Sequence, residues 1–246
     1  MNHRFFIYLP VIACALLSCA RDPDAIASPA FSVTPQECLQ IARTYTEMTW
    51  TPTEKNIMHG PSENGIMVHT PDKRMNFPAG GKGWWIAGGP HQGMPYKWGG
   101  FDTPVSFKAK IKQGLAAGDI YTKQKRELLE KAVSEEAAGI DCSGFISRCW
   151  RLERAYSTRE LASICAPLAS YADLRAGDIL NIYNQHVFLF SHWVKPGKIL
   201  AVYEAGPYPT WKVSQNNIEA DFLREKGYLP YRYTRMKADK TASKHP

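Results

Sequence analysis

The sequence predicts an α+β fold built around one main domain. Helix start signals and amphipathic patterns occur from residue 34 to about residue 165, whereas the pattern after Gly177 is that of antiparallel strands. The 246 residues include 44% hydrophobic and 22% charged positions, an ordinary globular composition in a chain long enough to bury a full core. No repeat of solenoid length occurs. These observations exclude collagen-like, disordered and solenoid classes.

The first two predicted helices are indicated by their ends and by their periodicity. Thr34 and Glu37 form a capping box, with Pro35 at the first helical position and an apolar stripe after it. Residues 123–138 carry apolar side chains on one side and charges on the other, and Gly139 follows as a helix stop. We therefore expect one helix from residue 35 and a long amphipathic helix over 123–138.

A third helix is predicted to begin after Asp141, which is a favourable N-cap residue. Cys142, Phe145, Ile146 and Cys149 follow at helical spacing, so Cys142 is expected in the first turn. Residues 157–160 form another capping box, and the short helix after it must end before Pro167.

Strands are predicted over residues 179–183, 186–194 and 199–204, with a turn over 195–198 between the last two. Residues 50–100 are rich in Gly, Pro and Trp and contain only short apolar pieces, which indicates long loops with short strands.

The N-terminus has the layout of an export signal. Arg4 precedes a nearly continuous apolar run over residues 5–17, which is too short to span a bilayer. Residues 1–18 are therefore predicted to be a signal peptide, and the protein to be exported to the periplasm or cell envelope. Ser18 followed by Cys19 resembles a lipoprotein box, in which lipidation of Cys19 would attach the protein to a membrane. A simple secretory signal cleaved near Ala20 fits the same residues.

The formal net charge of +7 is spread over the chain. Scattered Lys and Arg are typical of a solvated surface, so no nucleic-acid partner is expected. Residues 237–246 are polar and aperiodic, which predicts a disordered tail. Neither the cysteines nor the histidines have metal-ligand spacing, so no metal site is expected, and the sequence does not choose a disulfide pairing.

Cys142 is the candidate nucleophile. A thiol attacks as thiolate, and the unpaired N–H groups and the dipole at a helix start favour that charged form. Ser143 and Gly144 are small and leave the thiol approachable, and His186 begins a later strand. A thiol with an imidazole is what acyl transfer through a thioester requires. The alternative is that Cys142 is only a small buried hydrophobic residue.

Four short motifs follow one another along the chain: PYKWGG at 95–100, GIDCSGF at 139–145, LRAGDI at 174–179 and HVF at 186–188. As an ordered set they resemble the motifs of the NlpC family of papain-like bacterial cell-wall peptidases. The resemblance covers about residues 95–205. It implies a papain-like core with the nucleophile at the N-terminus of a helix packed on an antiparallel sheet. It also implies cleavage of the amide between D-γ-glutamate and a diamino acid in peptidoglycan stem peptides, without a cofactor.

By position in these motifs, the resemblance makes Cys142 the nucleophile and His186 the general base. Tyr96 would reach the site with its hydroxyl group. Asp141 and Ser143 resemble positions that in some members hold the free amine of an N-terminal L-alanine. Helix capping for Asp141 and a structural role for Ser143 are the alternatives.

The third catalytic position of the family orients the imidazole from the next strand, and Glu204 is the candidate here. A tight hairpin over 195–198 would place Glu204 opposite Phe190, four residues and about 13 Å from His186. A bulge or a longer loop must therefore bring the two together. Without such a shift, Glu204 is only a solvated strand residue and the orienting group comes from elsewhere. His192 is the alternative base, because period-2 alternation puts it on the face of His186, and a structural, aromatic-like role is the other interpretation of this residue.

The chain also departs from the family pattern. Residues 101–139 form a longer link than is typical, and we expect this insertion to line or cover the cleft. The predicted organisation is an N-terminal extension over 31–94 packed on a catalytic domain over 95–236. Trp84 and Trp85 of the extension are candidates for a substrate wall.

Fold and triad do not fix a substrate. An amidase or acyltransferase acting on another substrate, and a catalytically decayed envelope protein that only binds its ligand, therefore remain as alternatives.

Overall fold

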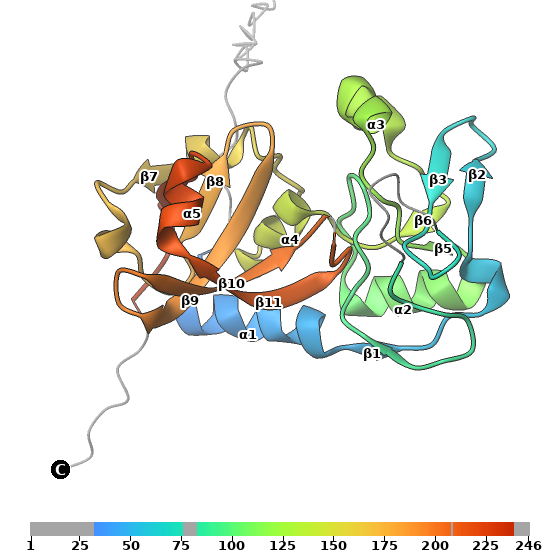
Figure 1. Cartoon of the computed structure of the whole chain (residues 1–246), viewed down its shortest axis with the longest axis horizontal. Coiled ribbons are helices and arrows are strands. Elements are labelled where there is room, and N and C mark those ends of the chain that lie inside the picture. Colours follow the sequence, from blue (N-terminus) through green and yellow to red (C-terminus); the bar gives the residue numbers. More distant parts are fainter. Residues whose placement is uncertain (1–31, 76–82, 208, 239–246) are drawn as a thin grey trace, which may run out of the picture.

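The computed structural model describes residues 32–75, 83–207 and 209–238. Its largest element is a six-stranded sheet of order β11-β10-β9-β8-β12-β7, in which every neighbouring pair is antiparallel (Figure 1). The strands are β7 (Cys165–Pro167), β8 (Ile179–Ile182), β9 (His186–Lys195), β10 (Ile199–Ala205), β11 (Val213–Glu219) and β12 (Leu229–Tyr233). With the helices around it, this sheet confirms the α+β class.

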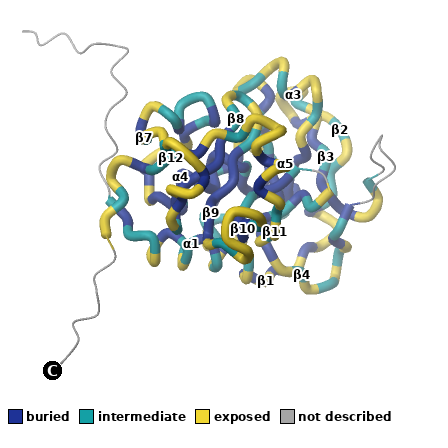
Figure 2. The backbone as a smooth tube through the Cα atoms, turned by 60° about the vertical axis from the view of Figure 1, so that its left-hand side comes forward, coloured by how far each residue is buried: buried dark blue, intermediate teal, exposed yellow. Residues whose placement is uncertain are grey.

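The two faces of the sheet are covered by different helices. Alternation along β9 sends Val187 and Leu189 to the face where α1 (Pro35–Glu47) and α4 (Cys142–Cys149) pack. Phe188 and Phe190 point the other way, into a second apolar cluster with α5 (Ala220–Glu225). Because both faces are covered, β8, β9 and β10 each contain a run of buried residues (Figure 2).

The α1 and α4 helices meet through two cysteines. The thiols of Cys38 and Cys149 are both fully buried and hydrogen-bond each other. The four cysteines in the described part of the chain, which also include Cys142 and Cys165, are free thiols.

A second group of elements lies beside the sheet, on the right in Figure 1. It contains two helices, α2 (Pro104–Gln113) and α3 (Lys123–Leu128). Short strands surround them: β1 (Thr49–Trp50), β2 (His59–Pro61), β3 (Met67–His69), β4 (His91–Gln92), β5 (Ala116–Ala117) and β6 (Ala137–Ala138). The prediction of loops with short strands over 50–100 is confirmed for the described residues.

Single turns of 3₁₀ helix complete the described secondary structure, at Glu54–Asn56, Leu129–Ala132, Leu161–Ile164 and Tyr171–Asp173. The turn at Leu161–Ile164 is the short helix that the capping box at 157–160 predicts, since Glu160 accepts from the backbone and the hydroxyl of Ser157.

The predicted long helix over 123–138 is wrong. Helix α3 ends at Leu128, and Leu129 has a left-handed φ of 52°, which an α-helix does not accommodate. After a 3₁₀ turn the chain becomes extended, and β6 pairs in parallel with β5 while the Glu136 carbonyl accepts from Ala116 N–H. Tertiary pairing of the buried strands overrides the helical periodicity of this segment.

The other predicted elements agree with the structure. Helix α1 has the Thr34 capping box, α4 starts after Asp141, and β8, β9 and β10 end within one residue of their predicted limits. The signal peptide over 1–18, Cys19 and residues 239–246 of the predicted tail lie outside the described residues. Within the described ranges, no helix has the length and apolar character that a membrane span needs.

Candidate active site

The first turn of α4 is fixed by its cap. The Asp141 carboxylate accepts from Gly144 N–H at 2.6 Å and from the Ser143 hydroxyl at 3.0 Å. Burial raises the pKa of Asp141, while these hydrogen bonds act in the opposite direction. Helix capping by Asp141 is therefore present, and Ser143 contributes to the same cap. Cys142 lies beside them in the first turn, with 7% of its surface exposed.

The glycines of the motifs allow α4 to lie directly on the preceding backbone. A Cβ added at Gly144 would overlap the carbonyl oxygen of Gly100, and one added at Gly100 would lie 2.5 Å from the carbonyl oxygen of Gly139. The Gly100 carbonyl accepts from Asp141 N–H at 3.2 Å. Larger side chains at these glycines would push the start of α4, and with it Cys142, away from this support.

His186 stands at the beginning of β9, between Cys142 and Glu204. Its Nε2 lies 2.8 Å from Oε2 of Glu204, and its side chain also hydrogen-bonds Cys142. Because Nε2 is used by the carboxylate, Nδ1 is the ring nitrogen left for the thiol. Burial acts to lower the pKa of His186, but the negative charges and hydrogen bonds of Cys142 and Glu204 outweigh it and raise this pKa to about 10. The arrangement favours the protonated, imidazolium form of His186.

The strand register explains how Glu204 reaches His186. The hairpin begins with Ile199 opposite Lys195, the register that a tight turn predicts. Two irregularities on β9 then shift the pairing by one residue each, so that Val202 lies opposite Phe190 and Tyr203 opposite Leu189. Glu204 therefore comes level with Phe188 instead of Phe190, diagonal to His186 on the same face. The shift that the sequence argument requires is present.

The second irregularity also removes His192 from the site. Ser191 is the extra residue there, and His192 pairs with Ala201 while Phe190 pairs with Val202. Neighbouring residues of β10 point to opposite faces, so His192 does not share the face of His186. The prediction that it does is wrong, because the bulge interrupts the period-2 alternation. His192 is exposed, and its Nδ1 lies 3.1 Å from the Ser191 hydroxyl.

Asn216 on β11 is a site residue that the sequence reasoning missed. Its Nδ2 donates to Oε1 of Glu204 at 2.7 Å, and to the Ser214 hydroxyl at 3.0 Å. The contacts thus run from Cys142 through His186 and Glu204 to Asn216, across three neighbouring strands. Residues 213–219 are mostly polar, so no apolar alternation in the sequence marks β11 or the residues that face Glu204.

Cys142 and His186 both open on one cleft of about 240 Å³, which Asp141, Ser143 and Tyr96 also line. Tyr96 is 4% exposed, its ring packs edge-on against Trp211, and burial raises its pKa well above the ordinary value. The structure thus brings all six sequence-predicted site residues together, with Glu204 behind His186.

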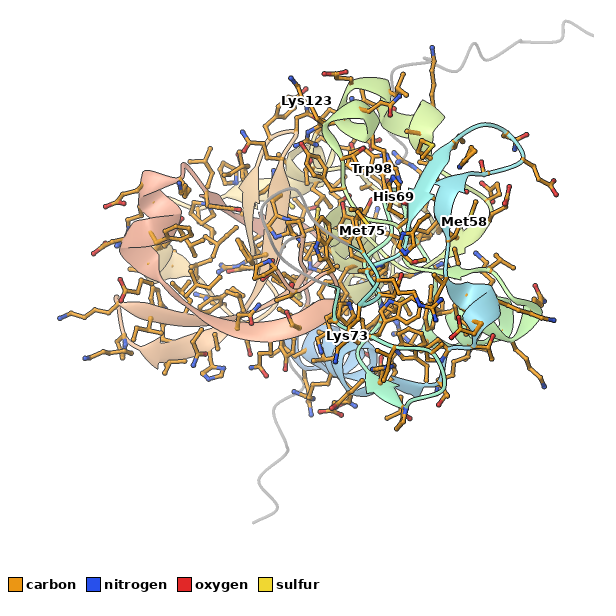
Figure 3. The ribbon with its side chains drawn as sticks, turned by 45° about the vertical axis from the view of Figure 1, so that its right-hand side comes forward. Met58, His69, Lys73, Met75, Trp98 and Lys123 are labelled. Atoms are coloured by element: carbon orange, nitrogen blue, oxygen red, sulfur yellow. The ribbon has the colours of Figure 1, made fainter. Side chains whose placement is uncertain are left out.

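The insertion over 101–139 contributes to the lining of the cleft, as expected. Tyr121, Arg126, Leu129, Glu130 and Val133 come from it and line the cleft. Trp98, which precedes the insertion, lies under the segment that starts at Lys123 (Figure 3), and its Nε1 donates to the Leu129 carbonyl at 3.1 Å.

Trp84 and Trp85 do not form a substrate wall, so that prediction is wrong. Trp85 is fully buried in the core, where it packs against Trp50. Trp84 donates to the Trp211 carbonyl at 3.1 Å. Neither side chain lines the cleft, because the extension uses its indoles to pack against the rest of the domain.

Within the part of the chain that the structure describes, no three His, Cys, Asp or Glu side chains come together as a metal site. No protein-family model matches the chain, and no curated protein matches it either. The chemistry of the site is therefore argued from its own residues.

Proposed function

We propose that this protein is an NlpC-type, papain-like cysteine peptidase that hydrolyses D-γ-glutamyl–diamino acid amides in peptidoglycan stem peptides. The observation that carries the proposal is the pairing of His186 with both Cys142 and Glu204 at one cleft. The papain-like core is part of the proposal. It is supported by α4, which carries Cys142 at its N-terminus and packs against β9 and β10, the strands that carry His186 and Glu204.

In the proposed first half-reaction, the Cys142 thiolate attacks the scissile carbonyl carbon. A C–S bond forms, and the carbonyl electron pair moves to oxygen. When the tetrahedral intermediate collapses, the C–N bond breaks and the His186 imidazolium gives its proton to the leaving amine. The raised pKa of His186 keeps that proton available at neutral pH. The products of this step are the free amine and a thioester on Cys142.

In the second half-reaction, water attacks the thioester while neutral His186 accepts a proton from it. The C–S bond breaks, the carboxylic acid leaves, and the thiolate and imidazolium are restored. The oxyanion of each intermediate would be stabilised by backbone N–H groups at the start of α4 and by the Tyr96 hydroxyl, both beside Cys142.

Two further roles belong to the proposal. Asp141 and Ser143 line the cleft and would receive the free amine of an N-terminal L-alanine through the oxygens left over from helix capping. The protein is proposed to act outside the cytoplasm on peptidoglycan peptides, after removal of residues 1–18, with a lipid on Cys19 as its membrane attachment. No cofactor, metal or nucleic acid takes part in this mechanism.

Incubation of the protein with defined stem peptides, followed by mass spectrometry of the products, tests the proposal. Wild type should add one water across the γ-glutamyl amide, and Cys142→Ala should lower kcat/KM by at least about 10³-fold. Cys165→Ala is the matched control, because Cys165 is a half-buried thiol outside the cleft. Hydrolysis by Cys142→Ala at the wild-type rate would overturn the assignment.

The same measurement separates the alternatives. Transfer of the acyl group to an added amine in place of water would indicate an acyltransferase. Tight binding of stem peptides by wild type without turnover would indicate a binding protein with a decayed triad.

A further inference from the structure

The cleft wall contributed by the insertion carries a positive charge that is not neutralised within the structure. Arg126 lines the cleft with part of its side chain exposed. Among the described residues no carboxylate forms an ion pair with it. Its guanidinium carbon lies 5.8 Å from the ring centroid of Tyr121, which also lines the cleft.

The other charged groups at the cleft all have partners. Arg159 forms an ion pair with Glu130, and both residues line the cleft. Asp141 caps α4, and His186 is paired with Glu204. Arg126 is therefore the positive charge at the cleft that remains for a bound molecule.

The position of Arg126 is fixed by the residue before it. Nζ of Lys125 makes a buried ion pair with the Asp119 carboxylate, with side-chain exposures of 3% and 0%. This contact ties α3 to the core and leaves the next side chain at the cleft. Burial raises the pKa of Tyr96, and the positive charge of Arg126 acts in the opposite direction. Arg126 and Cys142 line the same cleft.

We propose that Arg126 binds a free carboxylate of the substrate, on the residue that supplies the acyl group to Cys142. This inference rests on the proposed function and specifies which substrates the proposed peptidase prefers. A γ-linked glutamyl residue keeps its α-carboxylate free, separated from the scissile carbonyl carbon by Cγ, Cβ and Cα, whereas most α-linked residues carry no free carboxylate at all. A guanidinium recognises such a group through paired, charge-assisted hydrogen bonds. The substrate class is then a γ-glutamyl peptide whose α-carboxylate is not amidated.

Two peptides that differ at one group test the inference: one with the free α-carboxylate on the γ-linked glutamate, and one with a carboxamide in its place. Wild type should prefer the carboxylate peptide by about 10- to 100-fold in kcat/KM, mostly through KM. Arg126→Gln should lower kcat/KM for the carboxylate peptide to that for the carboxamide peptide. Lys123→Gln, which removes an exposed charge from the same helix outside the cleft, should retain the preference.

Equal cleavage of both peptides by wild type, or an undiminished preference in Arg126→Gln, would overturn the role of Arg126 and leave the proposed peptidase intact. If wild type cleaves neither peptide, calorimetric binding of both to Cys142→Ala decides the matter. If Cys142→Ala binds the carboxylate peptide more tightly than the carboxamide peptide, and Cys142→Ala/Arg126→Gln does not, the carboxylate site is supported even though no hydrolysis occurs. Equal binding, or none, overturns it.

Discussion

The side-chain amide of Asn216 donates to Oε1 of Glu204 at 2.7 Å, while the other oxygen of that carboxylate lies 2.8 Å from Nε2 of His186. The Glu204 carboxylate on β10 is therefore hydrogen-bonded to His186 on β9 and to Asn216 on β11. Glu204 has 12% of its side chain exposed, so water competes little for these bonds.

Asn216 is predicted to act as a positioning residue. Asn216→Ala removes the donor from Glu204 and frees its rotamer, and a hydrogen bond to a charged group contributes about 1.5–3 kcal/mol. We expect kcat to fall by roughly 10-fold or more with little change in KM, because the substrate cleft is untouched. Asn217→Ala, at an exposed neighbouring position, should keep wild-type kinetics. Restoration of kcat in Asn216→Gln but not in Asn216→Leu would separate positioning from strand packing.

Glu204→Gln is predicted to lower the pKa of His186, which is about 10 in the native protein. The carboxylate supplies both a hydrogen bond and a negative charge to the imidazolium, and the amide supplies no charge. The loss of catalytic rate on the alkaline side should therefore begin at a lower pH than in wild type. NMR titration of the His186 ring checks this directly, with His192→Gln as a control for the assignment. An unchanged His186 pKa in Glu204→Gln would show that Cys142, and not Glu204, raises the pKa of His186.

The same residue gives a prediction for stability. The pKa of His186 is higher in the folded protein than its ordinary value of 6.5, so proton binding there stabilises the fold. That contribution is complete below pH 6.5 and is lost as the pH rises through about 10. The free energy of unfolding of wild type should fall over this window more steeply than that of His186→Gln. Parallel curves from urea denaturation would contradict the assignment.

Gly144→Ala is predicted to destabilise α4 and displace Cys142. The added methyl group overlaps the Gly100 carbonyl, and overpacking of this kind costs about 1–3 kcal/mol. We expect a lower Tm and slower alkylation of Cys142 by iodoacetamide. Gly60→Ala is the matched control, because nothing lies within 4 Å of its added Cβ. Wild-type stability and reactivity in Gly144→Ala would show that the contact relaxes freely.

The buried ion pair of Asp119 and Lys125 is predicted to stabilise the insertion only as a pair. Lys125→Met leaves a buried carboxylate without its partner, which costs about 3–5 kcal/mol, whereas Asp119→Asn/Lys125→Met should recover much of that loss. The pair of Arg74 and Glu54, with 63% and 65% side-chain exposure, should contribute less than about 1 kcal/mol. Chemical denaturation of the variants measures both, and additive effects of the two substitutions at the buried pair would contradict the coupling.

The local parts of the fold could be predicted from the sequence because their signals are local. The capping residues Thr34 and Asp141 mark the starts of α1 and α4, and the alternation after Gly177 marks β8, β9 and β10. Helix α2 was missed although Pro104 at its start and Gly114 after its end obey the same rules. The motifs were enough to name Cys142 and His186 as candidates, together with Tyr96, Asp141 and Ser143. Glu204 was named from the predicted strand that follows His186.

The sequence by itself determined where helices and strands begin, and which thiol stands in the first turn of a helix, because these depend on neighbours along the chain. Only the tertiary structure decided the bulges that bring Glu204 to His186, the pairing of β5 with β6 that ends α3, and the arrival of Asn216 and Arg126 at the site. These features depend on residues far apart in the chain, whose packing outweighs local preference and leaves no periodic signal.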